Sequence, residues 1–314
     1  MLLTVVMSVK NGEPYLSEAI ESILNQTYKD YDFIIVNNNS TDKTASILEY
    51  YRNQDSRIRV ITNNLPYTYV EGRMLAFEKV KTDWVALMDA DDISEPMRFE
   101  KQINAIRKYG DKLGAIGVWA KQINNKGKVL ANSTFGATSI DEFEKLNNAN
   151  ETIGLIDPTA VFHLPTFYKA GGYRPYTVPA ADLDLWYRIA EAGRAVLVIP
   201  QYLFKYRVHN NSDSVRRSML QRKKTHFINY NMRVRRTGQN EISWDFYCKN
   251  IWQKPWYRFK KLRTDYGMVF YKVAGLNYAE GSKVLMLYWL VLAFFINPIF
   301  VIKRLYGQKL KSNN

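Results

Sequence analysis

The sequence contains little cysteine, shows no signal-peptide pattern and has few acidic residues in its last third. A single cysteine, Cys248, excludes an internal disulfide bond and a zinc site built from cysteines, and it fits a reducing compartment. The N-terminus lacks a basic segment followed by an apolar core and a cleavage site, so we expect residues 2–9 to form a first strand rather than a signal peptide.

The charge is distributed unevenly along the chain. Residues 1–202 contain 22 lysines and arginines and 25 acidic residues, a net charge of −3, whereas residues 203–314 contain 22 and 5, a net charge of +17. The whole chain of 314 residues therefore carries +14. This break predicts an acidic catalytic body and a basic tail that meets an anionic partner, either lipid or nucleic acid.

The first 200 residues alternate between short apolar runs and helical patterns. Several runs are apolar over four or more residues, as in strands that are covered on both faces. Their alternation with helices predicts an α/β fold with a mainly parallel central sheet. We expect strands at 2–9, 33–36, 59–62, 84–88, 115–118 and 195–199, and helices within 14–26, 40–52 and 94–110, the last capped by Ser94.

Polar segments follow three of the expected strands, namely SVKNGE, NNNSTD and DADD. Ligands of such sheets bind beyond the carboxyl ends of the strands, so we expect these three loops to converge on one crevice.

The stretch VALMDADDIS, residues 85–94, concentrates three carboxylates at the end of an apolar strand. Asp89 and Asp91 are two positions apart on an extended segment, so they point the same way and can meet one cation. Mg²⁺ or Mn²⁺ suits such oxygen ligands and leaves positions for substrate phosphates. The alternative is a solvated acidic turn that caps the next helix, a role that Asp92 also fits.

Two later segments supply further candidates. Asp182 and Asp184 lie before an apolar helical stretch, where an aspartate either stabilises the helix N-terminus or acts as a general base. Asp184 fits the helix role better. His209 lies in the polar segment YRVHNNSDS, where it could contact a metal or a phosphate, although a lone histidine is usually not a ligand.

Several of these segments occur together in the order and at the spacing of a known family. They resemble family 2 glycosyltransferases of the GT-A fold, over roughly residues 3–215. The resemblance implies a Rossmann-like nucleotide-binding domain at 1–215, with a nucleotide-sugar half at 1–92 and an acceptor half at 93–215. The segments are SVKNGEPYL, SILNQTYKDYDFIIVNNNSTDKT, LMDADDISEPMRFEKQ, DPTAVF, GGYRP, AADLDLWYRIAEAG and YRVHNNSDS.

The resemblance also implies a nucleotide-sugar donor, Mn²⁺ or Mg²⁺ as cofactor, and inversion at the anomeric carbon. Asp182 would be the catalytic base and Asp91 the main metal ligand. Asp89 would contact the donor ribose or the metal, and His209 would lie near the metal and the diphosphate. The loops that cradle the nucleotide would contain Ser8, Val9, Asn11 and Asn38.

The chain departs from the family pattern at three places. In the first loop, Ser8 and Lys10 stand where the family frequently has proline and tyrosine. Residues 37–39 are Asn-Asn-Asn where the family commonly has Asp-Asp-Gly, and Ala181 replaces the glutamate before the base. An amide both donates and accepts hydrogen bonds, so it can still read a base edge. UDP is the expected nucleotide, but the asparagines leave the choice of a different nucleotide open. Arg98 and Gln102, where the family also carries these residue types, have either a structural or an acceptor-side role.

Residues 216–314 are predicted to form a basic, aromatic, helical tail. Within it, residues 284–302 run for 19 positions without a charge, a helical length of about 28 Å that is close to a bilayer core of about 30 Å. The alternative is a buried core helix. Because both flanks are basic and Asn297-Pro298 interrupts the run, we favour a re-entrant or in-plane hairpin on anionic lipid over a single-pass span.

The sequence thus predicts metal-dependent, inverting sugar transfer to a glycan or lipid-linked acceptor in cell-surface polysaccharide synthesis, at the cytoplasmic face of the plasma membrane. The basic tail carries no nucleic-acid-binding motif, so we expect no nucleic acid partner. Two alternatives stay open: a nucleotidyl- or phosphotransferase with the same acidic metal site, and a catalytically silent, membrane-associated nucleotide-sugar-binding protein.

Overall fold

The computed structural model describes residues 3–65, 68–208, 217–279 and 281–312. The chain divides into two compact units, residues 1–209 and 210–314. The boundary between residues 215 and 216 that the sequence predicts lies outside the described residues. Each unit is considered by itself below.

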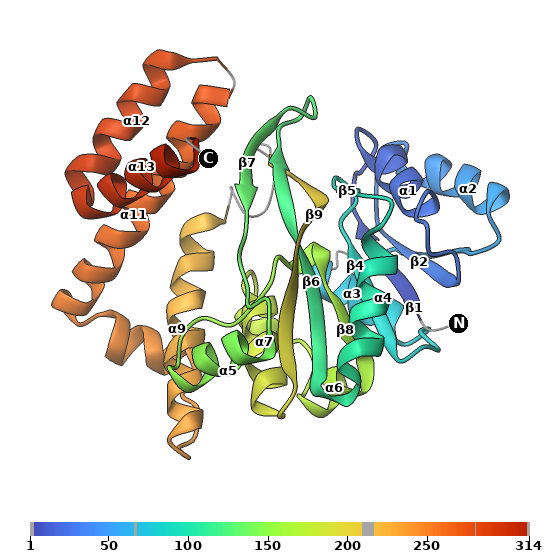
Figure 1. Cartoon of the computed structure of the whole chain (residues 1–314), viewed down its shortest axis with the longest axis horizontal. Coiled ribbons are helices and arrows are strands. Elements are labelled where there is room, and N and C mark those ends of the chain that lie inside the picture. The colour runs from blue at the N-terminus through green and yellow to red at the C-terminus, as the bar shows by residue number, and fades with distance from the viewer. Residues whose placement is uncertain (1–2, 66–67, 209–216, 280, 313–314) are drawn as a thin grey trace. The chain divides into compact units, whose positions relative to one another are not determined.

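One mixed sheet organises the N-terminal unit (Figure 1), with the strand order β3-β2-β1-β4-β8-β6-β9-β5 and with β7 paired to β6. Strands β1 to β4 pair in parallel, as do β6 and β9. The other pairings are antiparallel. In the described residues the strands are β1 (Leu3–Val9), β2 (Tyr31–Asn38), β3 (Ile58–Asn63), β4 (Trp84–Met88), β5 (Ile93–Ser94), β6 (Leu113–Ile123), β7 (Val129–Ser133), β8 (Val161–His163) and β9 (Ala195–Arg207).

The six strands expected from apolar runs are all present, which confirms the α/β class. The side chains of β4 are all buried, as its continuous apolar run predicts for a strand inside the sheet. The three strands that the sequence did not reveal are short, or in the case of β7 largely exposed, so they carry no apolar run.

Helices connect these strands and pack on the sheet. They are α1 (Leu16–Leu24), α2 (Thr44–Gln54), α3 (Tyr69–Phe77), α4 (Arg98–Tyr109), α5 (Ile140–Asn148), α6 (Leu164–Lys169) and α7 (Ala181–Glu191), with 3-10 turns η1 (Gly110–Lys112), η2 (Asp157–Thr159) and η3 (Pro175–Thr177). The predicted cap at Ser94 is wrong. Ser94 belongs to β5 and pairs with Phe204, so α4 begins only after Met97.

Arg98 and Gln102 form a buried polar link between α4 and the sheet. The Arg98 guanidinium donates to the carbonyl of Leu87 at 2.9 Å and to Gln102 Oε1 at 3.1 Å. The Gln102 amide donates to the carbonyls of Ile116 and Thr159, both at 2.8 Å. Both side chains are fully buried, and burial lowers the pKa of Arg98 to about 9. Of the two roles that the sequence left open, the structural one fits these contacts.

The C-terminal unit is helical. Its described elements are α9 (Ser218–Arg236), α10 (Trp244–Phe246), the π-helix η4 (Tyr247–Trp252), α11 (Pro255–Ala279), α12 (Lys283–Ile296) and α13 (Pro298–Ser312). Helix α11 packs closely on α12, because Gly267 lets Asn297 approach its backbone, and the Arg263 Nε donates to the last carbonyl of α12 at 2.9 Å.

The uncharged segment 284–302 is divided between α12 and α13 at Asn297, where Pro298 starts a new helix. At 14 residues, α12 is about 21 Å long, short of the roughly 30 Å core of a bilayer. Within the described ranges, no helix has both the length and the apolar character needed to cross a membrane.

Candidate active site

The carboxyl ends of β1, β2 and β4 lie side by side, because these strands are parallel and in register. Val9 pairs with Asn37, and Met7 pairs with Met88, the residue before Asp89. The loops that follow β1 and β2 are joined directly, since the backbone N–H of Thr41 donates to the Asn11 side chain at 2.9 Å. The predicted convergence of the polar loops is therefore what the fold produces.

Helix α3 lies against the predicted nucleotide loops. The Asn38 amide donates to the Ser8 hydroxyl at 2.6 Å and accepts from Asn63 at 3.5 Å. Gly72 faces both Ser8 and Asn38, and a Cβ at this position would overlap with their side chains. Asn38 is 2% exposed, so its side chain holds the loops together here, while the exposed Asn11 and half-buried Ser8 border the solvent.

Arg73, the next residue of α3, lies between two carboxylates. Its Nη2 is 2.8 Å from Asp89 Oδ1 and its Nη1 is 2.5 Å from Asp157 Oδ2. The same Nη1 donates to the Tyr173 hydroxyl at 3.5 Å, and the guanidinium lies over the ring of Tyr69. Arg73 is 1% exposed. The buried guanidinium thus links α3 to the end of β4 through Asp89 and to η2 through Asp157.

Asp89 is the partly open carboxylate of this cluster, with 37% of its side chain exposed. Loss of hydration raises its pKa to about 6; the charge of Arg73 opposes this rise, and that of Asp91 adds to it. A site where neighbouring carboxylates raise each other's pKa favours binding of a cation.

Asp182 joins the same cluster from the first turn of α7. Desolvation raises its pKa to about 7, with a further contribution from the charge of Asp157. Burial also raises the pKa of Tyr69, and the charges of Asp182 and Asp157 raise it further. One oxygen of Asp157, Oδ1, is buried and has no hydrogen-bond partner among the described residues. The fold thus brings Asp89 and Asp182, 93 positions apart in the sequence, to one acidic centre around Arg73.

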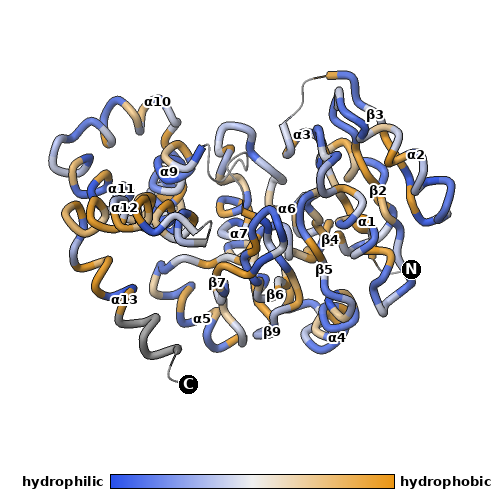
Figure 2. The backbone as a smooth tube through the Cα atoms, turned by 90° about the horizontal axis from the view of Figure 1, so that it is seen from above, coloured by the Kyte–Doolittle hydropathy of each residue, from blue (hydrophilic) through white to orange (hydrophobic). Residues whose placement is uncertain are grey.

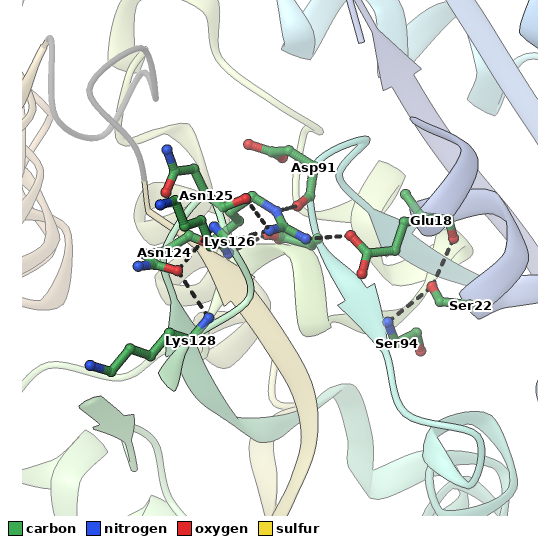
Figure 3. Close-up of polar contacts among 11 residues, drawn as sticks. Glu18, Ser22, Asp91, Ser94, Asn124, Asn125, Lys126 and Lys128 are labelled. Atoms are coloured by element: carbon green, nitrogen blue, oxygen red, sulfur yellow. Dashed lines mark hydrogen bonds and ion pairs between the residues drawn. The ribbon is translucent and has the colours of Figure 1, made fainter. Parts of the chain in front are cut away.

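Arg207, at the end of β9, fixes the loop that contains Asp91 (Figure 3). Its Nε donates to the Asp91 carbonyl at 2.7 Å, and its Nη2 lies 2.5 Å from Glu18. Its Nη1 donates to the Asn124 carbonyl at 3.1 Å, and its backbone N–H donates to Asp92 Oδ1 at 2.7 Å. In Figure 3 the Asp91 side chain points away from Glu18 and Asn124. Arg207 thus orients Asp91 through its backbone carbonyl.

Asp92 and Asp184 have structural roles. Asp92 is 1% exposed, and burial raises its pKa well above the usual range. It binds the end of β9 and does not cap α4, which begins six residues later. Asp184 is 2% exposed and lies 2.8 Å from Arg188, whose guanidinium also donates to the Gly172 carbonyl at 2.6 Å.

The donor set around Asp89 and Asp91 suits a hard divalent cation. Among the described residues, no group of three or more histidine, cysteine or acidic side chains converges as a complete metal cage. Mg²⁺ and Mn²⁺ need no such cage, since they commonly bind one or two carboxylates and take other ligands from water and substrate phosphates. His209, the third predicted ligand, lies outside the described residues.

Arg73, Asp157 and Arg207 are site residues to which the sequence pattern assigns no role, although Asp157 lies in the segment DPTAVF. Arg73 lies in the segment YVEGRMLAF, and a charged residue within a largely apolar helix was the available signal. Arg207 lies in YRVHNNSDS, directly before the residues that drew attention to that segment. Neither segment indicates what its arginine binds, because the groups bound by the two arginines are up to 189 positions away in the sequence.

Residues 4–167 match the family described as glycosyl transferase family 2. The chain is 29% identical over 220 residues to the O-antigen biosynthesis glycosyltransferase WbnJ of Escherichia coli, covering 67% of this chain and 81% of that protein. The family match contains Asp89, Asp91 and Asp157 and ends before Asp182.

Solved structures with a similar fold include S. aureus TarS 1–349 in complex with UDP-GlcNAc, with a TM-score of 0.57 and 15% identity over 94% of this chain and 91% of that chain. The mannosyltransferase PcManGT from Pyrobaculum calidifontis, in complex with GDP-Man and Mn²⁺, has a TM-score of 0.55 and 14% identity over 99% of this chain and 80% of that chain. The chain covers 49% of the longer TarS chain. These likenesses confirm the predicted GT-A fold.

Replacement of Arg73 tests whether its charge holds the acidic centre together. We expect Arg73→Gln to lower the free energy of unfolding by about 3–5 kcal/mol, because two carboxylates lose their buried counter-charge. The double variant with Asp157→Asn should recover part of that loss. Urea unfolding measures both values.

The matched control is Arg52→Gln, since Arg52 pairs with Glu49 at 2.6 Å on an exposed helix surface. Its cost should stay below about 1 kcal/mol. An Arg73 variant as stable as the Arg52 variant would contradict the role assigned to Arg73.

Proposed function

This chain belongs to glycosyl transferase family 2 and is a glycosyltransferase, and we propose that it is an inverting, divalent-metal-dependent enzyme. The observation that carries the proposal is the acidic centre, in which the expected base Asp182 and the expected donor-side residue Asp89 share one electrostatic environment around Arg73. The relative's role in O-antigen biosynthesis supports a part in cell-surface polysaccharide synthesis.

Asp182 acts as the general base. Its carboxylate removes the proton from an acceptor hydroxyl, whose oxygen forms a bond to the anomeric carbon while the bond from that carbon to the diphosphate oxygen breaks. Attack comes from the face opposite the diphosphate, so the configuration inverts. A nucleoside diphosphate leaves without being protonated, so one carboxylate suffices, unlike the pair that glycoside hydrolysis needs.

Asp91 and Asp89 hold the metal, Mn²⁺ or Mg²⁺, on the donor side. A bound divalent ion supplies positive charge that neutralises the leaving diphosphate. Arg73 keeps one oxygen of Asp89 occupied, and Arg207 keeps the backbone of Asp91 fixed, so both residues position the carboxylates. The Mn²⁺ present with PcManGT supports this choice of cofactor.

UDP is the proposed nucleotide of the donor, and the acceptor is a glycan or a lipid-linked sugar. The TarS complex with UDP-GlcNAc supports UDP, whereas PcManGT binds GDP-Man, so thermal shifts with both nucleotides discriminate between them. A larger rise in Tm with GDP than with UDP, at equal concentration with Mn²⁺, would reverse the nucleotide assignment.

The C-terminal unit contacts the cytoplasmic face of a membrane. Large apolar side chains of α12 are exposed, among them Val284 at 82% and Phe295 at 79%, and Figure 2 shows α12 as a mainly hydrophobic segment. Exposed apolar surface of this kind is typical of an interaction site, and the net charge of +17 over residues 203–314 suits anionic lipid.

Removal of the proposed base should abolish transfer and leave donor binding intact. We expect Asp182→Asn to lower kcat by about a hundredfold to ten-thousandfold, with an unchanged Kd for UDP measured by calorimetry. Asp141→Asn, at an exposed position on α5, is the control. Near-normal turnover of the Asp182 variant would refute the base assignment, and a wild-type chain that binds donors without transfer or hydrolysis would favour the silent binding protein.

The pH dependence of the reaction follows from the state of Asp182. Its pKa is raised to about 7, chiefly by desolvation, and only the deprotonated carboxylate accepts a proton. We therefore expect kcat/KM to fall about tenfold per pH unit as the pH drops below about 7 and to level off above it. A rate that does not change between about pH 5.5 and 8 would show that another group accepts the proton.

Metal dependence can be measured without turnover. We expect UDP to raise Tm by several degrees in the presence of Mn²⁺ and much less with a chelator, since binding to the folded state stabilises it. Asp91→Ala should lose the Mn²⁺-dependent part of the shift, whereas Asp141→Ala should keep it. An equal shift with and without Mn²⁺ would exclude the proposed metal site.

Membrane contact depends on the exposed side chains of α12. We expect Phe295→Asp to reduce the fraction of protein that sediments with anionic vesicles severalfold, because a charge on the contact face opposes insertion. Phe135→Asp changes a phenylalanine that is 44% exposed in the N-terminal unit and should bind as the wild type does. Equal sedimentation of both variants would place the contact elsewhere.

A further inference from the structure

A pocket of about 220 Å³ lies between α9 and α11 in the C-terminal unit. The two helices run antiparallel, since His226 Nε2 is 2.9 Å from Asp265 and Arg222 contacts Met268. The pocket is formed by the first turns of α9 and the second half of α11. Its lining residues are Ser218, Gln221, Arg222, Thr225, Val269, Lys272, Val273 and Leu276.

Positive charge in this pocket is not fully balanced. Arg222 lies 3.7 Å from the buried carboxylate of Asp265, which His226 also contacts. Lys272 has neither an ion pair nor a hydrogen bond within the described part of the chain. Burial lowers the pKa of Lys272, and the charge of Arg222 lowers it further. Among the described residues, the second cation of the pocket therefore has no counter-ion, and a bound anion would supply one.

The remaining walls are of two kinds. Ser218 and Thr225 offer hydroxyl groups on the α9 side, and Val269, Val273 and Leu276 form an apolar wall on α11. Two cations beside hydroxyls suit a phosphate group, for which arginine and lysine are the usual partners. The volume is below the roughly 300–1,000 Å³ of sites that hold whole small-molecule ligands, so the pocket suits a phosphate with a few methylene groups rather than an entire nucleotide-sugar.

We propose that this pocket binds the phosphate group of an amphiphile, with the phosphate at Arg222 and Lys272 and the first methylene groups along Val269, Val273 and Leu276. The proposal extends the proposed membrane contact, because α11 packs directly on α12, the helix with the exposed apolar side chains. An anionic phospholipid of the membrane and a lipid phosphate that carries the acceptor share this chemistry.

The test uses the full chain and two probes. Dihexanoyl phosphatidic acid, a soluble phosphate amphiphile, should raise Tm and bind by calorimetry, whereas glycerol 1-phosphate, which lacks acyl chains, should bind more weakly. Lys272→Met should weaken binding of the amphiphile about tenfold, because it removes one charge-assisted contact and keeps the apolar stem. Lys254→Met removes an exposed lysine outside the pocket and should bind like the wild type.

A second variant covers the case in which Lys272→Met folds poorly. Val273→Phe keeps every charge and fills the pocket, so it should abolish binding of the amphiphile. Equal loss in the Lys272 and Lys254 variants, or wild-type binding by Val273→Phe, would overturn the proposal, since binding would then follow general charge. Equal affinity for glycerol 1-phosphate and the amphiphile would overturn the lipid part and leave a free phosphate ester as the ligand.

Vesicles separate this site from the membrane contact. Wild-type protein should sediment more with phosphatidylcholine vesicles that contain phosphatidic acid than with phosphatidylcholine alone, and Lys272→Met should lose that difference. If no vesicle binds but the soluble amphiphile does, the membrane proposal fails and the pocket stands. If vesicles bind and the amphiphile does not, the pocket proposal fails alone.

Discussion

The ion pairs of Arg73 with Asp89 and Asp157 are the constraint on which the candidate active site depends. Three carboxylates, counting Asp182, crowd the ends of the strands, and mutual repulsion would open this region without a buried cation. One guanidinium neutralises only part of that charge. Desolvation, together with this excess charge, keeps the pKa of Asp182 raised, and the excess leaves Asp89 suited to a metal. Arg73 is therefore important both for the fold and for the proposed chemistry.

A second buried arginine performs a similar task on the other side of the acidic loop. Arg207 binds the backbone of Asp91 and the side chains of Asp92 and Glu18, and it is 2% exposed. The acidic loop is thus held from α3 on one side and from the end of β9 on the other. Arg73 binds the side chain of Asp89, and Arg207 binds the backbone of Asp91, so the two proposed metal ligands are positioned by buried arginines.

The C-terminal unit uses charge differently. In the N-terminal unit buried arginines meet carboxylates, whereas the C-terminal unit has few acidic residues to meet its cations. Asp265 is shared between His226 and Arg222, and Lys272 faces a pocket. Excess positive charge beside an exposed apolar helix suits a surface that is itself anionic and apolar, which is the chemistry of a membrane.

The sequence by itself determined the α/β class, the six apolar strands, the family and the two carboxylate pairs. The strands follow from the periodic pattern of apolar residues, and the carboxylate pairs are recognised because their members are close in the sequence. Tertiary structure alone decided that Asp182 and Asp89 lie around the same Arg73 and Asp157, and that Arg207 supports the acidic loop. It also made Ser94 a strand residue rather than a cap, because pairing with Phe204 outweighs local capping preference. Contacts between residues far apart in the chain leave no periodic signal, so only the folded sheet reveals them.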